Sequence, residues 1–148
     1  APQAARMDSL RGGGRRVFII DAYQKRARGL EEHLLDAGCH CTYFEEISGA
    51  LLAMRSLNPA LIVIELGEPG LLTASSENVE MLVELSREAV EVVGISPVLV
   101  NDAGASASQI YGCSGRISTI VAPPWDNDTV SLLLSILAHV ERQRLGAA

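Results

Sequence analysis

From residue 16 onward, short apolar runs alternate with longer amphipathic stretches along the chain. The run ALIVIEL, residues 60–66, is apolar at almost every position, as a strand covered on both faces is. The stretches between the runs repeat apolar residues every three or four positions, which is the period of a helix with one buried face. This alternation is typical of βα units, in which parallel strands form a sheet with helices on both sides. Strands are expected at 16–21, 39–46, 60–66, within 90–101 and at 116–125.

Helix-end signals support the same order of elements. Gly38 is placed to end the first helix, and Ser48 is expected to cap the second. Asp126 is expected to cap the last helix, which carries acids in its first turn and arginines in its last. Five strands and five helices in alternation predict an α/β fold of flavodoxin type, a doubly wound parallel sheet whose functional crevice lies at the carboxyl ends of its strands. Helices are expected over 23–38, 48–57, 75–89, 104–115 and 126–145.

The fourth strand has two interpretations. Gly94 and Pro97 interrupt the run VEVVGISPVLVND, residues 90–102. Because both residues break regular structure, the strand lies either at 90–95 or at 97–101.

Length and charge limit the classes of function. A chain of 148 residues suits one domain with a single core. The formal net charge of -6 leaves no basic stripe for a phosphate backbone, so direct nucleic-acid binding is not expected. The apolar runs are too short to span a membrane and no secretory signal precedes them, so no membrane contact and a cytoplasmic location are expected. Residues 1–15 are interpreted as a leader, 16–143 as the domain and 144–148 as the start of a linker.

The three cysteines are not expected to form a disulfide framework. Cys39 and Cys41 lie in the motif CHC within an expected strand, where neighbouring thiols suit packing in the reduced form. With His40 they supply too few ligands for a metal site, and no second cluster of cysteine and histidine adds to them. No metal and no cofactor are therefore expected.

Two acids and a proline-rich segment stand at the expected carboxyl ends of the strands. Asp21 ends the first strand, Glu65 ends the third 44 residues later, and PPWDNDTV begins at Pro123. Together with the segment ELGEPG that starts at Glu65, this order resembles the receiver domain of bacterial response regulators over nearly all of residues 16–143. The resemblance implies the CheY-like form of the predicted sheet.

The resemblance also shows where this chain departs from the family. There, a pair of acids after the first strand binds Mg²⁺, an aspartate after the third receives a phosphoryl group, and a lysine precedes the proline after the fifth. In this chain, Ala22 occupies the position of the second acid, Glu65 that of the phosphoacceptor aspartate, and Pro123 that of the lysine. The extra methylene group moves the Glu65 carboxylate by about 1.5 Å, an error that in-line attack tolerates poorly. Since phosphoryl transfer needs a placed nucleophile and a compensating cation, we predict a pseudo-receiver, a regulatory domain that is not an enzyme and does not use phosphorylation.

Three further positions bear on this prediction. By spacing, the family's hydroxyl residue after the fourth strand is either Ser96 or Asp102, and its aromatic switch is Ile120. Glu65 has two interpretations. Its carboxylate either hydrogen-bonds amides at the strand end or imitates a charged aspartyl phosphate and favours one conformation.

The resemblance implies partners as well. Because receivers commonly dimerise through their fourth helix, fifth strand and fifth helix, it implies a homodimer on that face. The last expected helix runs on through HVERQRL, residues 139–145, without a stop signal, as a linker helix does. An output domain is therefore expected in the same chain, with this segment as the N-terminal module of a bacterial transcription regulator. The alternatives are a flavodoxin-like sensor of a small molecule or nucleotide, and a receiver that is still phosphorylated. The interaction face is expected to include Tyr111, Ile120, Trp125, Leu132 and Ile136.

Overall fold

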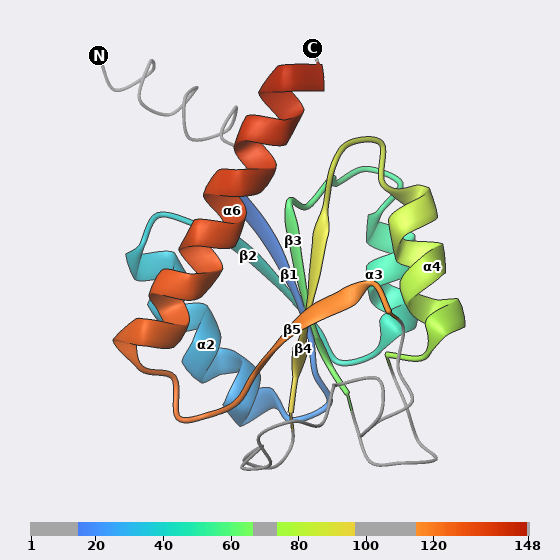
Figure 1. Cartoon of the computed structure of the whole chain (residues 1–148). Coiled ribbons are helices and arrows are strands. Elements are labelled where there is room, and N and C mark those ends of the chain that lie inside the picture. Colours follow the sequence, from blue (N-terminus) through green and yellow to red (C-terminus); the bar gives the residue numbers. More distant parts are fainter. Residues whose placement is uncertain (1–14, 67–73, 97–114, 148) are drawn as a thin grey trace.

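A five-stranded sheet forms the centre of the molecule (Figure 1). The computed structural model describes residues 15–66, 74–96 and 115–147. The strands lie in the order β2-β1-β3-β4-β5, and every neighbouring pair is parallel. The predicted doubly wound α/β sheet is therefore confirmed. The strands are β1 (Arg16–Ile20), β2 (His40–Phe44), β3 (Leu61–Glu65), β4 (Glu91–Ile95) and β5 (Ile117–Val121).

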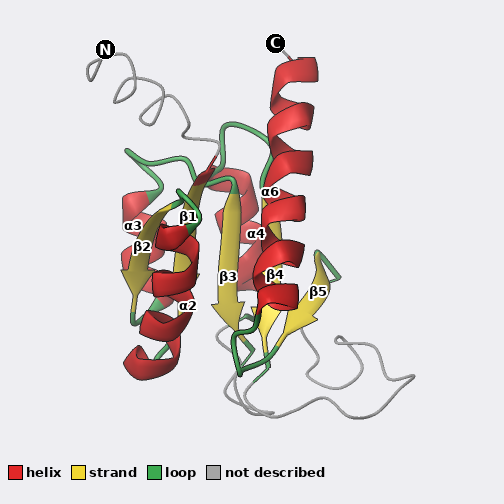
Figure 2. Ribbon diagram, turned by 90° about the vertical axis from the view of Figure 1, so that its left-hand side faces the viewer, coloured by secondary structure: helices red, strands yellow, loops and turns green. Residues whose placement is uncertain are grey.

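Helices cover both faces of the sheet. Helices α2 and α6 lie on one face, and α3 and α4 lie on the other (Figures 1 and 2). This arrangement buries the strands on both sides, which explains why β3 is apolar at every position before its final glutamate. The helices are α2 (Gln24–Asp36), α3 (Ile47–Ala53), α4 (Ser76–Leu85) and α6 (Asn127–Ala147).

Alternate side chains of each strand enter two separate cores. Val17 and Ile19 of β1 pack in the core between the sheet and helices α2 and α6, called the α2/α6 core below. Phe18 and Ile20 pack in the core between the sheet and helices α3 and α4, called the α3/α4 core. The helix faces predicted from periodicity meet these cores. The fully buried helical residues of the α2/α6 core are Ala27, Leu30, Leu34, Leu133, Leu137 and Val140.

Of the three predicted helix ends, two agree with the structure and one differs, and Ser75 forms a further cap. Gly38 has a positive φ of 88° just after α2, which glycine adopts without strain. Asp126 caps α6, since its Oδ1 accepts the Thr129 N–H at 2.8 Å. Ser75 caps α4 through the Asn78 N–H. The predicted cap Ser48 is wrong, because α3 already begins at Ile47, which packs against the α3/α4 core and so sets the helix start one residue earlier.

The fourth strand takes the first of its two predicted positions. It runs over Glu91–Ile95 and includes Gly94. A Cβ at Gly94 would lie 2.8 Å from Leu66 Cδ2, so this glycine makes room for a buried leucine and does not break the strand. The other position, 97–101, and residues 104–114 of the helix expected over 104–115 lie outside the described residues. Within the described ranges, no helix is both long and apolar enough to cross a membrane.

Candidate functional site

Two acids meet at the carboxyl ends of adjacent strands. Since Ile20 of β1 pairs with Ile64 of β3 in parallel register, the residues that follow them, Asp21 and Glu65, come together at this edge of the sheet. Asp21 is fully buried, and only 8% of Glu65 is exposed. Carboxylates buried this deeply need a counter-charge or a proton.

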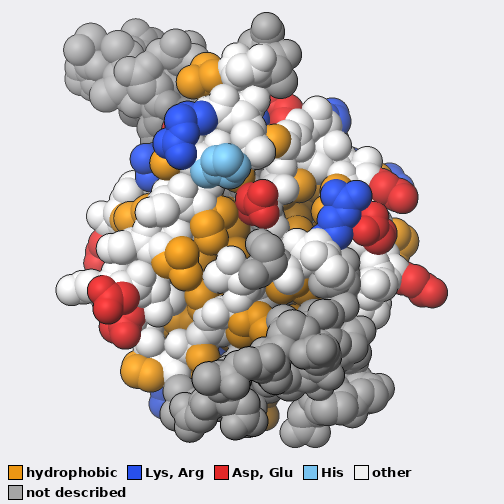
Figure 3. All heavy atoms as spheres, in the orientation of Figure 1, with side chains coloured by type: hydrophobic (Ala, Val, Ile, Leu, Met, Phe, Trp, Pro, Cys, Tyr) orange, Lys and Arg blue, Asp and Glu red, His pale blue; other side chains and the backbone are white. Residues whose placement is uncertain are grey.

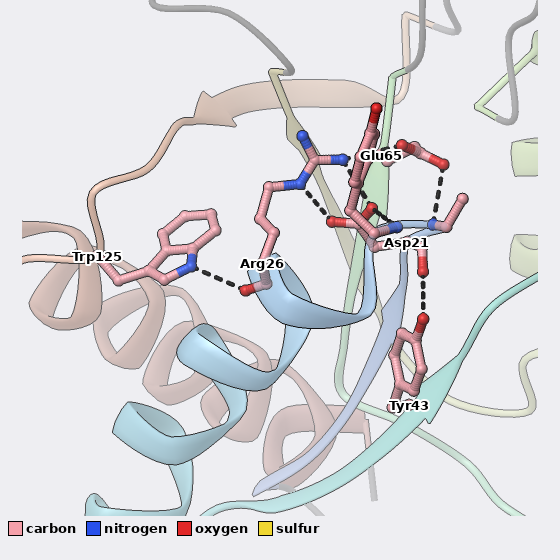
Figure 4. Close-up of polar contacts among 7 residues, drawn as sticks. Asp21, Arg26, Tyr43, Glu65 and Trp125 are labelled. Atoms are coloured by element: carbon pink, nitrogen blue, oxygen red, sulfur yellow. Dashed lines mark hydrogen bonds and ion pairs between the residues drawn. The ribbon is translucent and has the colours of Figure 1, made fainter.

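The counter-charge is Arg26, in the first turn of α2 (Figure 4). Its Nε donates to Asp21 Oδ2 and its Nη2 donates to Asp21 Oδ1, each at 2.6 Å. Nη2 also donates to Glu65 Oε2 at 2.9 Å. The guanidinium thus binds one carboxylate through two hydrogen bonds and bridges to the other. Two-point binding of this kind is the strong form of an arginine–carboxylate pair.

Neighbouring groups hold the two acids in place around Arg26. The Tyr23 N–H donates to Asp21 Oδ1 at 2.8 Å, and the Ala22 N–H donates to Glu65 Oε1 at 3.0 Å. From β2, the Tyr43 hydroxyl donates to the backbone oxygen of Asp21 at 2.7 Å. All four carboxylate oxygens therefore accept a hydrogen bond. Of the two interpretations of Glu65, the structure shows the bond to a backbone amide.

The pKa values reflect these contacts. The hydrogen bond to Asp21 and the charges of both acids raise the pKa of Arg26 above its ordinary value despite its burial, so the guanidinium stays charged. Burial raises the pKa of Glu65, and the charge of Asp21 adds to this effect, while the Ala22 N–H and Arg26 oppose it. With both acids ionised, one negative charge is left uncompensated.

The receiver resemblance implies Mg²⁺ at this edge of the sheet, and the residues present do not fit that ion. Mg²⁺ needs closely placed oxygen ligands. Here Ala22 replaces the second acid, and the guanidinium of Arg26 lies between Asp21 and Glu65. Among the residues that the structure describes, no group of three or more acids, histidines or cysteines could hold a metal ion. The cation at this site is one of the chain's own side chains.

Trp125 joins the segment after β5 to the same turn of α2. Its indole Nε1 donates to the backbone oxygen of Arg26 at 3.0 Å (Figure 4). The half-buried ring packs against the α2/α6 core and over Gly29, where an added Cβ would lie 3.2 Å from Trp125 Cδ1. Glycine at this position therefore allows the close approach of the indole to α2.

The remaining predicted pocket residues are Ser96, Asp102 and Pro123. Ser96 follows β4 and is fully buried, with its backbone N–H bonded to β5 at 2.8 Å. Pro123 follows β5 and supplies no side-chain cation. Asp102 lies outside the described residues, so the choice between Ser96 and Asp102 stays open.

The predicted interaction face is exposed only in part. Ile120 packs against the α3/α4 core and Ile136 against the α2/α6 core, so both are half-buried. Leu132 is 42% exposed. Apolar side chains gather on the face of the molecule where the first half of α6 and β5 lie (Figure 3). Tyr111 lies outside the described residues.

The two thiols that the structure describes have raised pKa values. Cys39 is buried, Cys41 is half-buried, and both are free. Burial raises the pKa of Cys39, and it raises the pKa of Cys41 to about 12. Thiols with raised pKa values stay protonated, which suits the packing role predicted for them. Cys113 lies outside the described residues.

Sequence reasoning missed Arg26. The segment QKRARG, residues 24–29, contains three basic side chains, and its composition does not tell which of them faces inward. Helical spacing does carry a signal, because Arg26 precedes the buried Leu30 by four positions and Leu34 by eight. Arg26 therefore continues the buried stripe of α2 to the end of the helix that lies beside Asp21.

Comparisons with known proteins agree with this architecture. No protein-family model and no curated protein matches the chain. A CheY-like receiver domain from Methylobacillus flagellatus is 23% identical, with a TM-score of 0.63 over 82% of this chain and 98% of that one. The response regulator TrrA from Thermotoga maritima, solved in complex with Mg²⁺–BeF, is 16% identical, with a TM-score of 0.62 over 83% and 98% of the two chains. The N-terminal domain of a response regulator/sensory box/GGDEF three-domain protein from Carboxydothermus hydrogenoformans is 15% identical, with a TM-score of 0.60 over 86% and 94%.

These likenesses concern the fold. The strand order, the parallel register and the helices on both faces define an α/β protein with the CheY-like receiver fold. The predicted resemblance to receiver domains is confirmed at that level. What the site does follows from its own residues, above all from Arg26 between the two acids.

Proposed function

We propose that this chain is a regulatory receiver-like domain that acts without phosphorylation. The observation that carries the proposal is the bridge from Arg26 to both Asp21 and Glu65. Phosphoryl transfer requires a cation that can neutralise charge as it develops on the transferred group. The charge of Arg26 is already compensated by two carboxylates, and a guanidinium in this position leaves no room there for an ion from solution.

Glu65 is also a poor phosphoacceptor. Its Oε1 accepts the Ala22 N–H and its Oε2 accepts from Arg26, so both oxygens are engaged. A nucleophile needs an approach in line with the leaving group, and a carboxylate held in this way is not positioned for one. Pro123 adds no positive charge on the acceptor side. Arg26 and Pro123 therefore oppose phosphorylation independently of each other.

Acetyl phosphate with Mg²⁺, followed by intact-mass spectrometry, tests the proposal directly. We expect no phosphoryl adduct on this chain, whereas a phosphorylatable receiver treated in parallel gains one. Beryllofluoride with Mg²⁺ should leave Tm unchanged, because a ligand raises Tm only when it binds the folded state. A stoichiometric adduct, or a rise in Tm that requires beryllofluoride, would overturn the proposal and favour a phosphorylatable receiver.

The same thermal assay with a panel of nucleotides addresses the sensor alternative. We expect no stabilisation, because the residual negative charge at the site repels anionic ligands. A rise in Tm with one nucleotide, at a concentration where the others have no effect, would instead support a sensor domain.

We further propose that the domain acts in the cytoplasm through protein contacts, as a homodimer and as the N-terminal module of a transcription regulator. The exposure of Leu132 in the first half of α6 supports a contact between copies, as do the apolar side chains that gather where this part of the helix lies (Figure 3). The same fold in the N-terminal domain of a three-domain regulator supports a modular role. Light scattering should find a dimer that Leu132→Glu dissociates and Arg142→Glu, an exposed change on the same helix, does not. A monomer at every concentration would contradict the homodimer.

A further inference from the structure

Arg26 is bonded at two ends that lead to different parts of the molecule. Its guanidinium binds Asp21 and Glu65 at the edge of the sheet. Its backbone oxygen accepts the Trp125 indole N–H at 3.0 Å, across 99 positions of sequence. Figure 4 shows the arginine between the acids and the indole. Any movement of this turn of α2 that follows a change at the acids therefore reaches Trp125 through one residue.

Trp125 in turn fixes the start of α6. The next residue, Asp126, caps the helix by accepting the Thr129 N–H at 2.8 Å. The indole is confined, because its N–H has a backbone partner on α2 and its ring edge lies against the space that a Cβ at Gly29 would fill. The first turn of α6 is thus placed by the turn of α2 that carries Arg26.

The predicted switch position on β5, Ile120, offers no comparable connection. Ile120 has no hydrogen-bonding side chain, and it packs into the α3/α4 core on the other face of the sheet. Trp125, two residues before α6 begins, makes a polar contact with the backbone of Arg26, the residue that binds both acids.

We propose that Trp125 is a positioning residue that couples the Asp21–Arg26–Glu65 cluster to helix α6. In this arrangement, the ion pairing of the cluster sets how firmly the first turns of α6 are held. The inference rests on the proposed regulatory function, since it names the element through which the cluster acts on the rest of the molecule.

Intrinsic fluorescence provides the first test, because Trp125 is the only tryptophan of the chain. Arg26→Gln removes the guanidinium and keeps the backbone oxygen that Trp125 binds. We expect a red shift of the emission, and hydrogen exchange in the first two turns of α6 about five-fold faster, the effect of losing one typical hydrogen bond. Lys25→Gln removes an exposed charge from the neighbouring position and should change neither measurement.

The second test runs in the opposite direction and does not depend on the folding of Arg26→Gln. Trp125→Phe keeps an aromatic ring and removes the N–H donor. We expect the Nε–H proton of Arg26 to exchange with solvent about five-fold faster in NMR spectra of the arginine side chains. The Nε–H of Arg28, an arginine of the same helix with an exposed side chain, serves as the internal control.

The outcomes separate coupling from mere packing. A folded Arg26→Gln protein with wild-type emission and wild-type exchange in α6 would overturn the proposal. An unchanged Arg26 Nε–H in Trp125→Phe would do so as well. A phosphoryl adduct on the wild-type chain would refute the proposed function alone, and it would leave these two comparisons valid.

Discussion

Arg26 makes an otherwise unfavourable pair of buried acids compatible with folding. Two carboxylates at one edge of a sheet repel each other, and each loses hydration when it is buried. A single guanidinium binds both acids, because its fork of donors reaches both oxygens of Asp21 and one oxygen of Glu65. Removing one partner from such an ion cluster lowers the free energy of unfolding by more than the intact cluster contributes to it, since an uncompensated charge stays buried.

Arg26→Met should therefore lower the free energy of unfolding by about 3 kcal/mol, the lower end of the range for breaking a buried ion pair. The lower end applies because the side chains of Arg26 and Glu65 keep 12% and 11% of their exposure. Arg28→Met breaks a surface pair with Glu31 at 3.0 Å and should cost less than about 1 kcal/mol. Urea unfolding of both variants measures the difference. Equal losses would contradict a buried, bridging role for Arg26.

In the Arg26→Met protein, the two carboxylates face each other without a cation. Millimolar Mg²⁺ or Mn²⁺ should then raise Tm, because an ion that binds only the folded state stabilises it. The wild-type protein should not respond, since Arg26 lies between Asp21 and Glu65. Sodium chloride at matched ionic strength is the control in a thermal-shift series. A wild-type response equal to that of the variant would show that Arg26 does not exclude the ion.

Glu65 gives the site a pH dependence whose sign follows from its raised pKa. Between the ordinary value of about 4.3 and the raised value, the folded state binds more protons than the unfolded state, so the contribution of Glu65 to stability falls as the pH rises. Compared with Glu65→Gln, the wild type should gain stability as the pH falls through the raised pKa of Glu65, by at most about 1.4 kcal/mol per pH unit. Urea unfolding of both proteins at matched pH measures this difference. A wild type that loses stability relative to Glu65→Gln as the pH falls would contradict burial as the main cause of the raised pKa.

At the scale of elements, the features that local sequence determines were predicted correctly. The features that depend on tertiary contacts were not. The apolar runs of β1 and β3 and the stripe of α2 follow from local periodicity. Gly94 was interpreted as a possible break in the strand, because its contact with Leu66, the residue after β3, cannot be read from the local sequence. Ser48 was predicted to cap α3, because the tertiary packing of Ile47, which places the helix start before Ser48, is not visible in the local sequence.

The two serines provide a direct comparison. Ser75→Ala should lower stability by about 1 kcal/mol, because α4 loses the cap formed by the hydroxyl and the Asn78 N–H at 3.2 Å. Ser48→Ala should be neutral or slightly stabilising, because Ser48 lies inside the first turn of α3 and alanine is the better helix former. Thermal and urea unfolding of both variants measure this. A larger loss for Ser48→Ala would mean that its hydroxyl does cap the helix.

At the scale of the whole molecule, the sequence predicted the edge of the sheet that carries the site and missed what completes it. Asp21 and Glu65 were predictable because parallel strands bring their carboxyl ends together. The contact between Arg26 and Trp125 joins residues 99 positions apart, and no local pattern encodes it. The role of Gly29 could not be predicted either, because glycine is needed there only to leave space for the indole of Trp125.

Helix α6 connects this edge of the sheet with the opposite one. Near its far end, Arg144 Nε donates to the backbone oxygen of Ala89 and Nη2 to that of Pro59, both at 2.9 Å. Ala89 precedes β4 and Pro59 precedes β3, so these contacts lie at the amino ends of the strands. Helix α6 is therefore fixed to the body of the protein at both ends, beside the acids by Trp125 and at the far edge by Arg144.

Arg144→Met tests whether the two attachments are independent. Loss of both hydrogen bonds should speed hydrogen exchange about 25-fold in the last two turns of α6, about five-fold for each bond. The first turns should keep the wild-type rate, because Trp125 and the Asp126 cap hold them separately. Arg142→Met, an exposed change in the same turn, is the matched control. Faster exchange along the whole helix would show that α6 is released as one rigid unit, and unchanged exchange at the far end would show that the Arg144 contacts do not hold it.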